Sequence, residues 1–127
     1  MVISDEKLIK DWLDHMSNLN PNLDEYPEES VWIYLDRIIS KKPEQGWNII
    51  RKLARAARTD EERADVSAGP LEDLLKWHEG PPRFLCDDLE VFKMLIPYMW
   101  IHGMSYEKQR FILQLCKETG SGLPGSK

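Results

Sequence analysis

Apolar residues recur at helical spacing along almost the whole chain, and this pattern restricts the fold more than any other feature. Leu8, Ile9, Trp12, Leu13 and Met16 are spaced i, i+1, i+4, i+5 and i+8, which places them on one face of a helix. No segment alternates apolar and polar residues over more than a few positions, as a half-buried strand would. The sequence therefore predicts an all-α fold.

Proline and glycine divide this pattern into six or seven short helices. Further apolar stripes predict helices that begin near Pro27, Pro43, Thr59, Pro70, Leu89 and Ser105. Short connections between them favour stacked antiparallel hairpins, arranged as a helical-repeat-like stack or an irregular bundle. The 127 residues fit a single helical domain over 1–119, and the Gly/Ser-rich residues 120–127 are expected to form a flexible tail.

Local signals locate several helix ends. Thr59 and Glu62 have the spacing of a capping box, in which the first residue accepts a hydrogen bond from the backbone of the second. Gly69-Pro70 is expected to interrupt one helix and to begin the next sharply. Pro97 is expected to kink or end its helix, and Gly120 is a natural residue to follow a helix C-terminus.

The charge of the chain is unevenly distributed. The chain has 17 basic and 22 acidic residues, a formal net charge of −5, which disfavours nucleic acid and anionic membranes as partners. Residues 1–50 contain five basic and ten acidic residues, whereas residues 51–127 contain twelve of each. A basic protein partner is therefore expected to contact the N-terminal half at Asp24, Glu25, Glu28 and Glu29, with Trp77 as a candidate aromatic anchor.

The cysteine content and the N-terminal residues predict a cytoplasmic protein. The chain begins with an acidic segment and has no basic start followed by an apolar run, as a signal peptide would have. Cys86 and Cys116 are expected to be free thiols, both buried. The three histidines, His15, His78 and His102, lack the spacing of metal ligands, so we expect neither a metal site nor a cofactor.

Glu72, Asp73 and His78 are the residues that we consider for a cleft. The two acids begin a predicted helix, where the free backbone N–H groups also stabilise carboxylates. His78 continues the apolar face of that helix, so it is either a histidine at the edge of the core that caps the helix end or a catalytic group. If the three side chains converge, that cleft is the preferred functional site.

A stripe of basic residues follows one side of the third predicted helix. It consists of Arg51, Lys52, Arg55 and Arg58. The stripe has no interleaved aromatic residues, and acids follow it between Asp60 and Asp65. We therefore interpret it as a solvated helix flank that pairs with those acids, in preference to a phosphate-binding surface.

The segment Ser67 to Gly80 resembles the centre of an uncharacterised bacterial family of small helical proteins. The resemblance rests on Ala-Gly-Pro-Leu-Glu-Asp-Leu-Leu at 68–75, on Pro43 to Trp47 upstream and on Asp87 to Trp100 downstream. It extends over about residues 28–117. This chain departs from the pattern at Glu79 and at Pro81-Pro82. The resemblance implies an all-helical bacterial domain and carries no activity.

Three functions follow as hypotheses. The first is a non-enzymatic protein-binding protein, specifically an immunity protein or antitoxin that neutralises a basic bacterial toxin, since the acidic field would speed association with such a partner. The second is a helical adaptor or scaffold subunit. The third is an enzyme that uses Glu72, Asp73 and His78.

Overall fold

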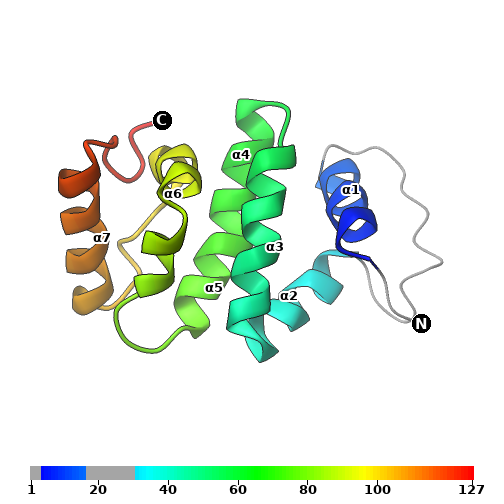
Figure 1. Ribbon diagram of the computed structural model, residues 1–127, viewed down its shortest axis with the longest axis horizontal. Helices are drawn as coiled ribbons and strands as arrows, with labels where there is room; N and C mark the ends of the chain where they lie inside the picture. The colour runs from blue at the N-terminus through cyan, green and yellow to red at the C-terminus, as the bar shows by residue number, and fades with distance from the viewer. Residues whose placement is uncertain (1–3, 17–30) are drawn as a thin grey trace.

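A computed structural model describes residues 4–16 and 31–127, without the side chains of His15 and Trp32 (Figure 1). Its α-helices are α1 (Asp5–Met16), α2 (Val31–Lys41), α3 (Pro43–Ala56), α4 (Asp60–Val66), α5 (Glu72–Trp77), α6 (Leu89–Leu95) and α7 (Tyr106–Thr119). A π-helical turn, η2 (Ser67–Leu71), and two 3-10 turns, η3 (Arg83–Asp87) and η4 (Ile96–Tyr98), complete the elements. The described ranges contain no strand, so the all-α prediction is confirmed. The helix start expected near Pro27 lies outside them.

The helices are arranged along one long axis. Figure 1 shows α1 at one end and α7 at the other, with α3, α4, α5 and α6 between them. The elements α4, η2 and α5 follow one another as one rod that lies beside α3 and runs in the opposite direction. A single residue, Lys42, joins α2 to α3, and Gly46 of α3 lies directly against Ile39 of α2.

Most of the expected helix ends are confirmed. Ser4 Oγ accepts the Lys7 N–H at 3.2 Å, and Thr59 Oγ1 accepts the Glu62 N–H at 3.1 Å. Pro43 occupies the first turn of α3, where its missing N–H costs no hydrogen bond. Gly120 ends α7 with φ 66°, a left-handed conformation that suits glycine. Side-chain caps and special residues therefore fix these boundaries locally.

Gly69-Pro70 does not interrupt the helix, and this expectation is wrong. The two residues lie inside η2, and the Glu72 N–H donates to the carbonyl oxygens of Gly69 and Ser67. Proline has no N–H and its ring collides with the carbonyl four residues earlier in a regular α-helix. The wider π turn accommodates the ring while the rod continues. Glu72 therefore does not cap a free helix N-terminus.

The core is built from the apolar stripes that the sequence predicts. Trp12 of α1 and Phe92 of α6 are its largest fully buried side chains, and Trp47 of α3 is also buried. Cys116 is buried as expected, but Cys86 is exposed, contrary to the expectation. The physical reason is its position in η3, a short turn that buries Leu85 and turns the next side chain outward.

The C-terminal residues pack against the domain, whereas the sequence predicts a flexible tail. The Lys127 N–H donates to the Pro97 carbonyl oxygen at 2.9 Å, and the Gly125 N–H to that of Ile96 at 3.4 Å. Proline at 97 ends α6 in the short turn η4, which leaves carbonyl groups accessible there. The backbone N–H groups of the C-terminal residues donate to these carbonyl oxygens, as the next turn of a helix would have done.

Candidate functional site

A cavity of about 540 Å³ lies between α5 and the loop that joins η4 to α7. Glu72, Asp73 and Lys76 line it from α5, and Trp100, His102 and Lys108 line it from the loop and α7. Its volume is within the range of ordinary ligand pockets. The structure therefore brings two of the three predicted cleft residues to one cavity, which we call the acidic cavity.

His78 does not line the acidic cavity. It follows the last residue of α5, and its Nε2 lies 3.3 Å from the Pro81 carbonyl oxygen. Its ring packs edge-on against Phe84, with centroids 5.0 Å apart. This geometry is that of a histidine at the edge of the core near a helix end. His102, which the sequence analysis did not select, occupies the cavity wall instead.

Burial perturbs both carboxyl groups of the cavity. The pKa of Glu72 is raised to about 7, first by burial and then by the charge of Asp73, although the Trp100 backbone N–H partly offsets this. The pKa of Asp73 is raised to about 6 by burial and by a hydrogen bond with the Asp36 carboxyl group of α2. Both groups therefore titrate near neutral pH.

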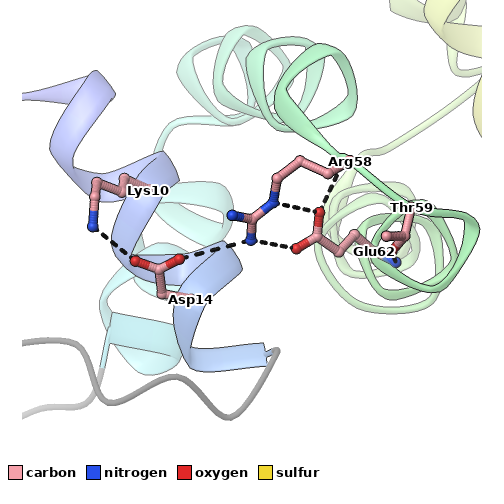
Figure 2. Close-up of polar contacts among 5 residues, drawn as sticks. All are labelled: Lys10, Asp14, Arg58, Thr59 and Glu62. Carbon is pink, nitrogen blue, oxygen red and sulfur yellow. Dashed lines mark hydrogen bonds and ion pairs between the residues drawn. The ribbon is translucent and has the colours of Figure 1, made fainter.

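Several other acids in the structure are paired with cations. Figure 2 shows Asp14 in contact with Lys10 at 2.8 Å and with Arg58 at 3.7 Å, and Glu62 in contact with Arg58 at 2.6 Å. Neither Glu72 nor Asp73 forms an ion pair with any described residue. Lys108 Nζ donates to the Leu75 carbonyl oxygen at 2.6 Å. The carboxyl groups of the acidic cavity thus form no ion pair within the described part of the chain, although Lys76 lies near enough to lower the pKa of Asp73.

Two tryptophans are exposed around the acidic cavity. Trp100, in its wall, is 64% exposed. Trp77, one helical turn beyond Asp73 on α5, is 53% exposed. The other proposed contact residues, Asp24, Glu25, Glu28 and Glu29, lie outside the described residues. Of the predicted partner-contact residues, Trp77 is thus the one that lies within the described part of the chain.

The ion-pair partners of the basic stripe differ from those that the sequence predicts. Arg58 contacts Glu62 as expected, but Arg55 binds Asp88 at 2.7 Å and Lys52 binds Asp5 at 2.9 Å. Arg51 also approaches Asp88, at 3.8 Å. The expectation fails for these three because α1 and the turn before α6 supply acids that are distant in sequence. The stripe therefore joins α3 to its neighbours.

Replacing Glu72 by glutamine is expected to change how stability depends on pH. A carboxyl pKa raised by folding means that the folded state binds more protons than the unfolded state, so stability falls as pH rises from about 4.5 to 7. Glu72→Gln should stabilise the fold at pH 8 by about 1 kcal/mol after allowance for solvent screening, and by almost nothing at pH 4. Urea unfolding at several pH values measures this, with the exposed Glu79→Gln as control. An unchanged pH slope in Glu72→Gln would contradict the assigned perturbation.

No group of three or more His, Cys, Asp or Glu side chains in the described ranges is arranged to hold a metal ion. None of the described helices combines the length and apolarity needed to cross a bilayer.

Comparisons with protein-family models, curated proteins and solved structures found no match to this chain.

Proposed function

We propose that this chain is a non-enzymatic protein-binding domain, and specifically a cytoplasmic immunity protein or antitoxin that neutralises a basic bacterial toxin. The observation that carries the proposal is Trp100, 64% exposed beside two carboxyl groups that have no direct counter-cation. Tryptophan is enriched among the residues that dominate binding energy at protein interfaces. A basic side chain from a partner would supply the cation that Glu72 and Asp73 lack.

Charge also supports this assignment. The net charge of −5 would accelerate encounter with a positively charged toxin surface and would disfavour acidic partners. A cytoplasmic location agrees with two free thiols, Cys86 and Cys116, one of them exposed. An inhibitor needs no catalytic group, and the separation of His78 from the two carboxyl groups fits such a role.

The test is affinity capture from source-cell lysate with matched surface variants. The wild-type chain and Tyr106→Ala, which removes an exposed aromatic outside the acidic cavity, should retain the same partner. Trp100→Ala should retain about tenfold less, because it removes the central aromatic contact. The captured partner should arrest growth when expressed alone, and co-expression of the chain should restore growth.

Each outcome of the capture has a defined meaning. Equal recovery by Trp100→Ala and wild type, or recovery of no partner by either, contradicts the proposed binding domain. A partner that depends on Trp100 but is not toxic supports the alternative, a helical adaptor or scaffold subunit.

A second candidate, an enzyme, is favoured by one observation. Glu72 has a pKa of about 7 in the acidic cavity, which suits a group that donates or accepts protons at neutral pH. Incubation of source-cell metabolites with wild type and Glu72→Gln tests this candidate. A metabolite consumed by wild type and untouched by the variant would support it, and identical metabolite profiles would exclude it.

A further inference from the structure

A second cavity, of about 610 Å³, lies elsewhere, in a groove between α1 and α3. Ile9 and Leu13 of α1 and Ala56 of α3 form its apolar floor. The side chains along its edges have aliphatic stems that extend this apolar surface while their charged ends remain in solvent. We call this cavity the basic groove, because of the charges described next.

Among the side chains that line the basic groove, basic ones outnumber acidic ones, and three of the cations also pair with acids outside the lining, Asp5, Asp88 and Glu62. Four basic side chains line it, Lys10, Lys52, Arg55 and Arg58, against two acidic ones, Glu6 and Asp14. The sign is thus opposite to the net charge of −5 of the whole chain. An apolar floor with a positive edge matches a ligand that has an apolar body and an anionic group.

The cations retain capacity for a further anion. Lys10 is 75% exposed, and among the described residues its carboxylate partner is Asp14. Arg58 binds Glu62 through Nε and Nη2, whereas its Nη1 has no hydrogen-bond partner among the described residues, as Figure 2 shows. Lys10 and Arg58 approach the same Asp14 carboxylate from two sides. An incoming carboxylate at this end would therefore meet two cations.

An ion pair lies near each end of the basic groove. Lys52 binds Asp5 at the beginning of α1, and Arg58 approaches Asp14 near the end of α1. Between Glu6 and Asp14 the helix rises by about 12 Å at 1.5 Å per residue. A partner helix would have to pass over these two ion pairs, whereas a short flexible ligand would fit between them. The dimensions thus favour a small molecule.

We propose that the basic groove binds a free, fatty-acid-like carboxylate of medium chain length. The alkyl chain lies over Ile9, Leu13 and Ala56, and the carboxylate contacts Lys10 and Arg58. This site is separate from the acidic cavity and does not depend on the protein-binding role proposed above.

Binding of decanoate is the test, measured by isothermal titration calorimetry at neutral pH and by displacement of the fluorescent anion 1-anilinonaphthalene-8-sulfonate. Decanoate should bind, whereas decyltrimethylammonium, with the same chain and opposite charge, should bind at least about tenfold more weakly. Ala56→Trp places a large ring on the floor from an exposed position and should reduce decanoate affinity at least about tenfold.

Charge variants keep the result interpretable if Ala56→Trp alters folding. Lys10→Glu should weaken decanoate binding by about tenfold, whereas Lys117→Glu, an exposed cation on α7, should leave it unchanged. Circular dichroism verifies that each variant is folded. Equal affinity for decanoate and decyltrimethylammonium, or full affinity in Lys10→Glu, overturns the proposal. Binding to anionic phospholipid vesicles without binding of free decanoate overturns it in favour of a membrane surface.

Discussion

Trp12→Ala is expected to lower the free energy of unfolding by about 4 kcal/mol, the cost of removing a large aromatic side chain from a packed interior. Trp12 is fully buried in the core, together with Leu8 on the same face of α1. Its loss removes the largest of the four apolar side chains that α1 buries in the core. Urea unfolding followed by circular dichroism measures the change.

The matched control for Trp12→Ala is Trp77→Ala, which removes the same side chain from a position that is 53% exposed. That variant should change stability by no more than about 0.5 kcal/mol. Trp12→Phe should cost less than Trp12→Ala, because it retains a ring and removes an indole N–H that has no acceptor among the described residues. A loss below about 1 kcal/mol for Trp12→Ala would contradict the buried position of α1.

Glu62→Ala is expected to lower the free energy of unfolding by about 2 kcal/mol, since it removes the acceptor of a half-buried polar network. The Glu62 carboxylate is 5% exposed and accepts the Arg58 backbone N–H at 2.6 Å, with Arg58 Nη2 at 2.6 Å and Nε at 3.1 Å. Figure 2 shows these contacts, which join the end of α3 to the beginning of α4. Thermal and urea unfolding at neutral pH measure the loss.

Glu61→Ala is the control for Glu62→Ala. It removes an exposed carboxylate from the same first turn of α4, so the effect on the helix dipole is matched while the network remains. Glu61→Ala should cost at most about 0.5 kcal/mol. Glu62→Gln should lie between the two, because its amide oxygen still accepts the Arg58 N–H. Equal stability of Glu61→Ala and Glu62→Ala would show that the network contributes nothing.

Helix positions were predictable because their causes are local. The cap at Thr59, the proline at 43 and the glycine at 120 act on backbone groups within a few residues, so sequence reading locates those ends. Gly69-Pro70 was misinterpreted for the opposite reason. Whether a proline ends a helix or is absorbed in a π turn depends on the packing of the rod beside α3, which local patterns do not contain.

The candidate site was only partly predictable. Glu72 and Asp73 were identified from their position before the leucines of α5, and the structure places both in the acidic cavity. His102 and Lys108 come from a segment about thirty residues later in the chain and reach the cavity through tertiary packing. No spacing rule links them to α5. The indication available in sequence was Trp100, an aromatic residue in a short segment between two helix signals.

The sequence by itself determined the helical class of this protein and the face of each helix that is buried, because apolar spacing at 3.6 residues per turn is a property of the chain alone. Tertiary structure decided which charges meet. Arg55 could pair with nearby acids in sequence, yet it binds Asp88, and Glu72 forms no ion pair with any residue that the structure describes. Coulomb attraction depends on distance in space, and packing of the apolar faces sets that distance.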